Sequence, residues 1–584
     1  MCGVFAVISK KKKPLDKTRC LEAANLIYNR GPDSLKYEFF KNATLFISNT
    51  VLSITGEVTK SRKLTSSRRY SISFNGEIYN YKQLNNDYLK LKKINQISDT
   101  NVLLNLHETL EHSKIPIKLD GMFSYLIYDN KNNNIIISND TQGEKNFYYF
   151  EDENFFIISS NIKSIITFIK KYTLNKITLK NYFRTRHFMS LQSTCFNKIS
   201  IFSNGIYFTY NLGNNKKKIS NYDNPLSWIS EKKYNELQNY TEKDLIEYFD
   251  YKLNNQIKTM IPKLKFGCVI SGGIDSTLQA GIISNHQQSK LNLVIDYGKK
   301  KDSIANNINL FDKYFKKKIT KLTCNEAQYI DYAKKCYEIV CSPLHTHDLP
   351  GRYLLSKKFR ENRCKVFFSA DGCDEIYGGQ QLYYDLFKKE FDYKKNHSPY
   401  SMAFDNFIEG EKNNPLDQYL DNKWREINKR YEFISCKKTR NILSSLFLDY
   451  FIQSISVANR SNDLVCCENS VEPRNVFIQK EILKIGFNLP FKYKINFKAK
   501  KKFQQKYLLK KLFTKYFDEK LIFPKKGFSG YPEALTTNGF KKINSLFAIN
   551  SSKNKNKKYI DIKNLKRDLN WKLINSEKFI NEHF

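Results

Sequence analysis

Short apolar runs separated by polar turns dominate the first 160 residues, and their β-branched and aromatic content predicts strands. Two stretches between them, Leu84–Lys93 and Thr100–His112, have the spacing of apolar residues that predicts helices. Strands interrupted by paired helices indicate a sheet-rich, layered α+β domain. The predicted strands carry the sequences "VFAVI", "TLFIS", "YSISF", "MFSYLIYD", "NNIIIS" and "NFFIIS".

The pattern changes in the second half of the chain. "FGCVI" is a continuous apolar run typical of a strand buried on both faces, and the helix-like "TLQAGIISN" follows it. The strands "LNLVIDYG" and "KVFFSA" flank a predicted helix around Glu326–Glu338, so we expect a parallel sheet with crossover helices. From about residue 380 onward the pattern is mostly helical. Residues 213–245 are polar and lysine-rich, which predicts a linker between one domain at 2–212 and another at 246–584.

Composition excludes some classes of protein. The chain has 584 residues, 41% of them hydrophobic, which is enough for more than one core. It has no run of 18 apolar residues and no basic-then-apolar start, so we expect neither a membrane span nor a secretory signal. Twelve cysteines without C-x-x-C spacing indicate neither a zinc site nor a disulfide scaffold, and a reducing cytoplasm fits best. Oligomeric state stays open, with a homodimer as one option.

The formal net charge of +39 is compatible with binding to nucleic acid or to an anionic surface. The lysines are spread along the whole chain and mixed with Asn, Ile and Tyr, whereas a phosphate-tracking site is a clustered stripe. We therefore expect no specific nucleic-acid partner.

The first residues, "MCGVFAVISK", place a cysteine directly after the initiator methionine. Removal of Met1 would leave Cys2 with a thiol nucleophile and an α-amine of near-neutral pKa on one residue. The alternative is an incidental cysteine at the start of a strand, and these residues alone do not decide between the two.

Two loops that follow predicted strands carry candidate chemistry. "VISGGIDSTLQA" places two glycines and two serines at a helix start, where backbone N–H groups bind anions. It lacks the lysine and the spacing of a Walker loop, and it matches the S-G-G-x-D-S loop of enzymes that split ATP between the α- and β-phosphates. The second loop, "FFSADGCDEIYGGQ", crowds Asp371, Asp374 and Glu375, whose repulsion a Mg²⁺ ion shared with Asp275 would relieve.

Read together, these residues resemble the glutamine-dependent asparagine synthetase family over nearly the full chain. The motifs that carry the resemblance at the front are Cys2, Arg30–Ser34, Leu52–Ile54, Asn75–Asn80, Ser98–Thr100 and Leu119–Asp129. Those at the back are "SGGIDS", "SADGCDE", Val471–Phe477 and Pro524–Phe528. The resemblance implies an N-terminal-nucleophile glutaminase domain with αββα layers, followed by a parallel-sheet ATP-pyrophosphatase domain with a helical C-terminal part.

The resemblance also implies residue roles at the front site. Cys2 attacks the carboxamide of glutamine, Asn75 and the backbone N–H of Gly76 form the oxyanion hole, and ammonia is released. Asp99 and Glu77 are placed at the bound glutamine, with Asp99 pairing with its α-ammonium group.

At the back, ATP activates an acceptor carboxylate, aspartate or another small one, as an acyl-adenylate, and ammonia then displaces AMP. Asp371 is expected to act on the attacking amine and Lys525 to neutralise phosphate charge, while Asp275 and Asp374 hold Mg²⁺. The residues expected to bind ATP or pyrophosphate are Ser271, Gly272, Gly273, Asp275, Ser276, Val294, Ile295, Ser369, Ala370 and Gly372. For Arg474 we favour a structural ion pair.

Several positions depart from the family pattern. The family has an arginine directly before "LSI" that pairs with the glutamine carboxylate, whereas this chain has Val51 there, with Lys60, Arg62 and Lys63 as candidate substitutes. Loss of that contact predicts glutamine binding weakened about 10- to 150-fold. Asp371 is one methylene shorter than the usual glutamate, and the family's R-D-x-x-G segment begins here with Asn139.

The acceptor segment "CSPLHTHDLPGRYLLS" also departs from the family, with His345, His347, Asp348 and Arg352. It is either loop drift or a pocket for a carboxylate other than aspartate. Three hypotheses remain: an asparagine synthetase, an amidotransferase for another carboxylate such as a sugar uronic acid, and a non-catalytic protein that kept the fold. Retention of Cys2 disfavours relatives that cyclise peptides or close β-lactams with an internal amine.

Overall fold

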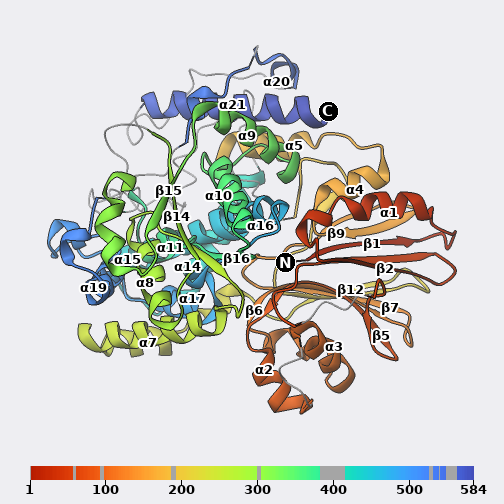
Figure 1. The fold of residues 1–584 in the computed structure, drawn as a ribbon, viewed down its shortest axis with the longest axis horizontal. Helices are drawn as coiled ribbons and strands as arrows, with labels where there is room; N and C mark the ends of the chain where they lie inside the picture. Colours follow the sequence, from red (N-terminus) through yellow and green to blue (C-terminus); the bar gives the residue numbers. More distant parts are fainter. Residues whose placement is uncertain are drawn as a thin grey trace.

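The protein is described here by a computed structural model (Figure 1). The described residues are 2–56, 61–91, 98–185, 192–298, 304–381, 384, 415–524, 530–537, 539–546 and 562–584. An N-terminal part built on two antiparallel sheets lies beside a larger part built on one parallel sheet and many helices (Figure 1). The predicted combination of α+β and α/β architecture is confirmed.

The N-terminal part contains two six-stranded antiparallel sheets. The first has the order β10-β8-β9-β1-β3-β2 and the second the order β12-β11-β7-β6-β5-β4. The strands of the first are β1 (Gly3–Ser9), β2 (Ser34–Phe40), β3 (Leu45–Val51), β8 (Tyr148–Glu151), β9 (Phe155–Ser159) and β10 (Ile199–Ile201). Those of the second are β4 (Thr65–Ser66), β5 (Tyr70–Ile78), β6 (Gly121–Asp129), β7 (Asn134–Asn139), β11 (Ile206–Asn211) and β12 (Lys217–Asn221).

The alternation of side chains along each strand explains the layers. Val4 and Ala6 of β1 pack between the sheets against residues such as Leu126, whereas Phe5 and Val7 face the helices on the outer side. Helices on the outer face of each sheet complete the predicted αββα arrangement. They are α1 (Lys17–Asn25) and α4 (Ile162–Ile169) on the first sheet, and α2 (Tyr81–Leu84) and α3 (Asp99–Thr109) on the second.

The second part contains a five-stranded parallel sheet of order β15-β14-β13-β16-β17. Its strands are β13 (Phe266–Val269), β14 (Leu291–Asp296), β15 (Ile319–Thr323), β16 (Val366–Phe368) and β17 (Glu472–Arg474). Helices α8 (Ile274–His286), α9 (Glu326–Val340) and α10 (Leu349–Glu361) connect them, as the alternating pattern predicts. The carboxyl ends of β13 and β16 therefore lie side by side.

A helical assembly surrounds this sheet. A π-helical segment (Tyr450–Ala458) joins α15 (Lys437–Asp449) and α16 (Asn459–Glu468) into one helical rod, and α21 (Ile562–His583) lies near the C-terminus (Figure 1). The remaining helices are α5 (Lys176–Thr185), α6 (Glu231–Asn239), α7 (Glu242–Met260), α11 (Cys373–Tyr377), α14 (Pro415–Arg430), α17 (Lys480–Asn488), α18 (Phe491–Lys494), α19 (Tyr507–Tyr516) and α20 (Lys541–Leu546).

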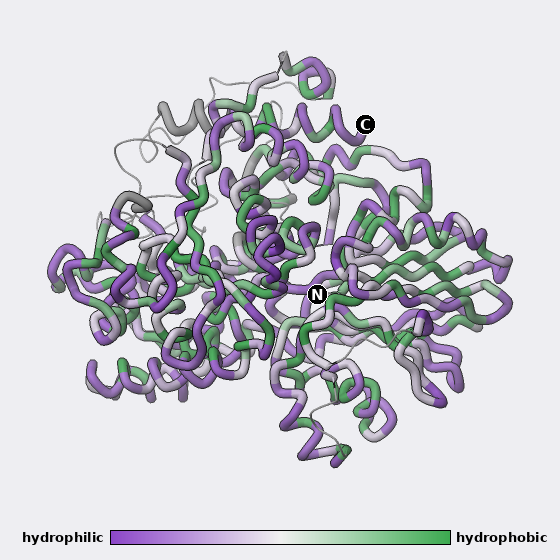
Figure 2. The backbone as a smooth tube through the Cα atoms, viewed as in Figure 1, coloured by the Kyte–Doolittle hydropathy of each residue, from purple (hydrophilic) through white to green (hydrophobic). Residues whose placement is uncertain are grey.

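Residues 213–245, predicted as a linker, contain regular elements. Strand β12 pairs with β11 at the edge of the second sheet, and α6 packs against α17 of the second part. Hydropathy along the backbone (Figure 2) shows apolar residues gathered on the strands of the sheets. Among the described residues, no helix combines the length and the apolar character needed to cross a bilayer.

Candidate active site

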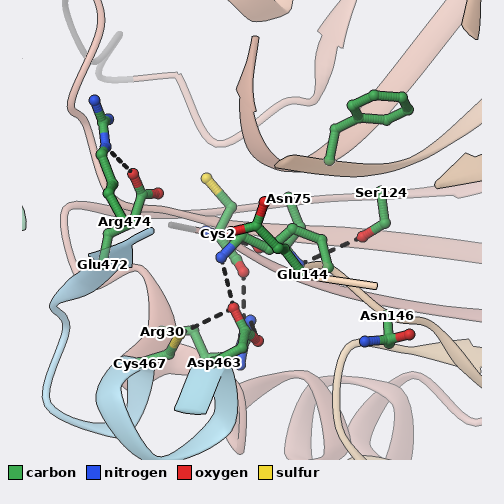
Figure 3. Close-up of polar contacts among 12 residues, drawn as sticks. Cys2, Arg30, Asn75, Ser124, Glu144, Asn146, Asp463, Cys467, Glu472 and Arg474 are labelled. Carbon is green, nitrogen blue, oxygen red and sulfur yellow. Dashed lines mark hydrogen bonds and ion pairs between the residues drawn. The ribbon is translucent and has the colours of Figure 1, made fainter. Parts of the chain in front are cut away.

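Cys2 lies at the start of β1 and is almost fully buried, with 8% of its surface exposed. Its backbone N–H donates to Oδ1 of Asn75 (3.2 Å), and Asn75 Nδ2 donates to the hydroxyl of Ser124 (3.4 Å; Figure 3). Burial raises the pKa of the Cys2 thiol, while positive charge at the N-terminus and the backbone of Leu52 oppose that shift. A thiol in this setting needs a base to become a nucleophile.

The residues predicted beside Cys2 come from β5 and α3. Gly76 has a φ of +146°, and a Cβ there would lie 2.1 Å from the Met122 carbonyl oxygen, so the position requires glycine. Asp99 is buried, and its carboxylate accepts hydrogen bonds from the backbone N–H of Ile78 (3.1 Å) and the hydroxyl of Thr55 (2.9 Å). Burial raises its pKa, and these hydrogen bonds oppose the shift. A cationic group beside Asp99 would complete its neutralisation.

Glu77, the next residue of β5, faces the other part of the protein. Its carboxylate lies 3.4 Å from the guanidinium of Arg474, which also pairs with Glu472 at 2.8 Å (Figure 3). The ion pair predicted for Arg474 is confirmed, and it extends across the two parts. Burial raises the pKa of Glu77, and Arg474 opposes that shift.

A second buried charge cluster joins the two parts directly behind Cys2. Arg30 donates from Nε to the Cys2 carbonyl oxygen (3.1 Å) and forms an ion pair with Asp463 of α16 (2.7 Å; Figure 3). Lys145 binds the other oxygen of Asp463 at 2.6 Å. Each of these three side chains is at most 8% exposed, so the attraction acts where water screens it little. The backbone of Cys2 is thereby tied to the helical rod of the second part.

The first predicted ATP loop follows β13. Gly272 has a φ of +77°, and Gly273 caps α8 without a side-chain hydrogen bond. The loop is held by its serines, because Ser276 Oγ accepts from the backbone N–H of Ser271 (3.0 Å) and lies 2.8 Å from Ser271 Oγ. Val294 lies in the adjacent strand β14 and is buried, as is Ile295. The N-terminus of α8 thus presents backbone N–H groups at the sheet edge.

The second predicted loop follows β16 and comes close to the first. Asp275 and Asp374 both form ion pairs with Lys506, which stands at the N-cap of α19. Among the described residues no cluster of three His, Cys, Asp or Glu side chains is placed to bind a metal. Oδ1 of Asp275 is nevertheless buried without a hydrogen-bond partner. Two convergent carboxylates fit Mg²⁺, which commonly takes one or two carboxylates together with phosphate oxygens.

Asp371 has a different environment from the one the sequence indicates. Arg352 of α10 binds both of its oxygens, at 2.8 and 2.5 Å, and also binds Asp348 at 2.6 Å. Ser369 donates to Asp371 as well (2.9 Å). Ala370 and Gly372, the latter with a φ of +80°, complete the turn between β16 and α11. The carboxylate of Asp371 is therefore held in place by several hydrogen-bond donors.

The remaining predicted positions are placed as follows. Val51 ends β3, Arg62 and Lys63 are exposed, and Lys60 and Lys525 lie outside the described residues. Asn139 donates to the Ser203 carbonyl oxygen at 3.0 Å.

Sequence reasoning missed Lys506, Asp463 and the partner of Asp371. Lys506 and Asp463 lie far in sequence from the residues they contact, and no spacing rule connects them to those residues. Arg352 was visible as an unusual residue in the acceptor segment, but its contact with Asp371 depends on how α10 packs beside β16.

Comparison with known proteins agrees with this geometry. The family described as "Glutamine amidotransferase domain" matches residues 1–222, and that described as "Asparagine synthase" matches residues 249–570. A putative glutamine-hydrolysing asparagine synthetase of Methanocaldococcus jannaschii is 27% identical over 67% of this chain and 78% of its own length. Asparagine synthetase 1 of Saccharomyces cerevisiae and the enzyme of Gallus gallus are each 24% identical, over 65% of this chain and 66% of their own lengths.

Among solved structures, the glutamine PRPP amidotransferase from B. subtilis aligns with 50% of this chain and 75% of that chain. The identity is 11% and the TM-score is 0.27, which is too low to add to the argument. The "Asparagine synthase" match alone spans more than half of the 584 residues. The chain belongs to the asparagine synthase family and is an ATP-dependent, glutamine-dependent amide ligase.

Proposed function

We propose that this protein makes asparagine from aspartate, glutamine and ATP, releasing AMP and pyrophosphate. The observation that carries the proposal is the pairing of two sites within one chain. Cys2, Asn75 and Asp99 gather in the αββα part, and Asp275 and Asp374 converge at the carboxyl edge of the parallel sheet. Buried ion pairs connect the two parts.

In the proposed reaction, Cys2 attacks the amide carbon of glutamine and forms a thioester, and the amide nitrogen leaves as ammonia. Asn75 and the N–H of Gly76 stabilise the oxyanion, each donor contributing about 2.7–4 kcal/mol. Asp99 binds the α-ammonium group, which supplies the missing neutralising charge at that buried carboxylate. Glu77 shapes this pocket through its pair with Arg474.

In the second site, the aspartate side-chain carboxylate attacks the α-phosphorus of ATP, and pyrophosphate leaves into the Ser271–Ser276 loop. In this proposal, the backbone around Val294 and Ile295 contacts adenine, and Ser369, Ala370 and Gly372 contact the nucleotide from the second loop. Mg²⁺, when held by Asp275 and Asp374, neutralises charge on the phosphates. Lys506 is available to move from these carboxylates to the leaving pyrophosphate, beside the role proposed for Lys525.

Ammonia then attacks the acyl-adenylate and AMP leaves. Because Arg352 and Ser369 hold Asp371 in place, its carboxylate is proposed to accept a hydrogen bond from the incoming ammonia and so to orient the attack. Arg352, which pairs with Asp371, comes from the segment that departs from the family pattern.

The departure of that segment from the family pattern supports a second candidate, in which the acceptor is another carboxylate such as a sugar uronic acid. The experiment that separates the candidates incubates the protein with ATP, Mg²⁺, ammonium and a panel of carboxylates, and measures pyrophosphate release. Release with aspartate, together with asparagine as product, supports asparagine synthesis. Release only with another acid assigns the second candidate, and release with none refutes both.

A further inference from the structure

The glutamine site proposed above assigns a partner to the α-ammonium group of the substrate, and it assigns none to the α-carboxylate. Glutamine is a zwitterion, and Asp99 accounts for its α-ammonium group. Its α-carboxylate also loses water when the pocket closes, and a buried carboxylate needs a cation or several hydrogen bonds. We therefore expect a cation for the α-carboxylate on the same sheet face as Cys2, several ångströms from the thiol. The carboxylate lies several single bonds, roughly 5 Å, beyond the carbon that the thiol attacks.

The strand register identifies that face. Val4 pairs with Asn49 of β3, and Asn49 pairs in turn with Lys36 of β2, so the three residues form one row across the sheet. Val4 packs between the two sheets, which places the side chains of this row on the inner face. Asn49 confirms the direction, because its side chain bonds to the backbone of Phe74, the residue before Asn75.

Lys36 is thus on the inner face, two positions from the row that contains Val51. Ser34 pairs with Val51, and the backbone of Cys2 continues that same row beyond Gly3. Lys36 is diagonal to Val51 on the neighbouring strand β3, about 7–8 Å away, and Cys2 lies one strand further, on the other side of β3. Val51, on the strand between them, has an apolar side chain and offers no charge of its own to a carboxylate.

The surroundings of Lys36 agree with this position. The residue is only 8% exposed, although it stands on an edge strand of the sheet. Burial lowers the pKa of its ammonium group, and the Cys2 thiol is close enough to oppose that shift electrostatically. Lysine is rarely buried this deeply unless its ammonium group is paired.

The other described cations near Cys2 do not fit the role as well. Arg30 binds the carbonyl oxygen of Cys2 and Asp463, on the side of the interface between the two parts. Arg62 and Lys63 are exposed.

We propose that Lys36 binds the α-carboxylate of glutamine and thereby selects the free amino acid as nitrogen donor. This inference rests on the proposed glutaminase function. It assigns to β2 a contact that the family pattern places at the end of β3, where this chain has Val51.

The test compares Lys36→Met with Lys17→Met, using ammonia release from glutamine and from glutamine α-methyl ester. Lys17 stacks on Phe39, which faces the opposite side of β2, so the control removes a lysine from the same region. We expect Lys36→Met to raise the KM for glutamine about tenfold or more with little change in kcat. The ester, which has no α-carboxylate charge, should be turned over equally by Lys36→Met and the wild type. Lys36→Arg should keep most of the affinity for glutamine.

A rescue adds a second, independent readout. Val51→Arg in the Lys36→Met background places a guanidinium on the same face and should lower the KM for glutamine again. Equal losses on glutamine and on the ester would show a structural role for Lys36 and overturn the proposal. A Lys36→Met variant with the same KM for glutamine as Lys17→Met would also overturn the proposal. A wild-type protein that releases no ammonia from either substrate would instead refute the glutaminase function itself.

Discussion

Replacing Asp463 by asparagine tests whether the buried charge cluster couples the two parts of the protein. Asp463 neutralises both Arg30 and Lys145, and each of the three side chains is at most 8% exposed. Its replacement removes the carboxylate that pairs with both buried cations, and breaking a buried pair typically costs about 3–5 kcal/mol. For a domain of this size, that loss corresponds to a melting temperature lower by roughly 5–10 °C.

Function should respond as well, and unevenly. Arg30 donates to the carbonyl oxygen of Cys2, so its displacement disturbs the nucleophile before it disturbs the ATP loops. We expect glutamine-driven synthesis to fall more than ammonia-driven synthesis in Asp463→Asn. The double variant Asp463→Asn, Lys145→Gln also removes one of the two cations that Asp463 pairs with, and it should be more stable than the sum of the two single effects predicts.

The pH dependence provides a further check. Burial alone would raise the pKa of Asp463, but the charges of Arg30 and Lys145 lower it overall. A carboxylate with a depressed pKa in the folded protein stabilises it above the pKa of the unfolded chain, and this contribution is lost as pH falls through the folded value. The difference in melting temperature between wild type and Asp463→Asn should therefore persist from neutral pH to about pH 5 and shrink below about pH 4.

The matched control is Asp518→Asn, which removes an exposed partner of Lys313. Melting is followed by circular dichroism, and the two nitrogen sources are compared by amide product. If Asp463→Asn has the same melting temperature as the Asp518→Asn control, the cluster does not couple the two parts. The same conclusion holds if glutamine-driven and ammonia-driven synthesis fall in equal proportion.

Three further predictions concern the ATP site. Asp275→Asn and Asp374→Asn should each suppress ATP-dependent pyrophosphate release while ammonia release from glutamine survives; unchanged release at ordinary Mg²⁺ would remove their role. Gly379→Ala should lower pyrophosphate release, because its Cβ would lie 1.9 Å from Asp374 Oδ1; wild-type release would contradict that packing. Arg352→Met should lower kcat for amide formation at least tenfold by freeing Asp371, with normal ammonia release. Wild-type amide formation would contradict it.

The sequence predicted the architecture well because periodicity reports on burial. The runs around Val4 and Leu126 alternate between two packed faces, and "FGCVI" is buried on both, so each pattern follows directly from its layer. The segment 213–245 was harder to interpret, since β12 is an exposed edge strand whose polar composition resembles that of a loop.

The candidate site was predictable where chemistry is local. Glycines at positive φ and carboxylates beside a helix start leave a signature within a few residues, as at Gly272 and Asp275. Lys506, Asp463 and Lys36 leave no such signature. Each contributes through tertiary packing, which brings its charge close to a residue more than 30 positions away in the chain. A single sequence does not show which distant residues come together in space.

The central claim is that one chain opens glutamine at Cys2 and uses the nitrogen at the ATP site. The most direct measurement supplies glutamine labelled with ¹⁵N in its amide, together with unlabelled ammonium, aspartate, ATP and Mg²⁺, and determines the mass of the amide product. Wild-type protein should yield labelled asparagine, whereas Cys2→Ala should yield only unlabelled asparagine at an undiminished ammonium-driven rate. Labelled product from Cys2→Ala, or loss of both routes together, would contradict the account.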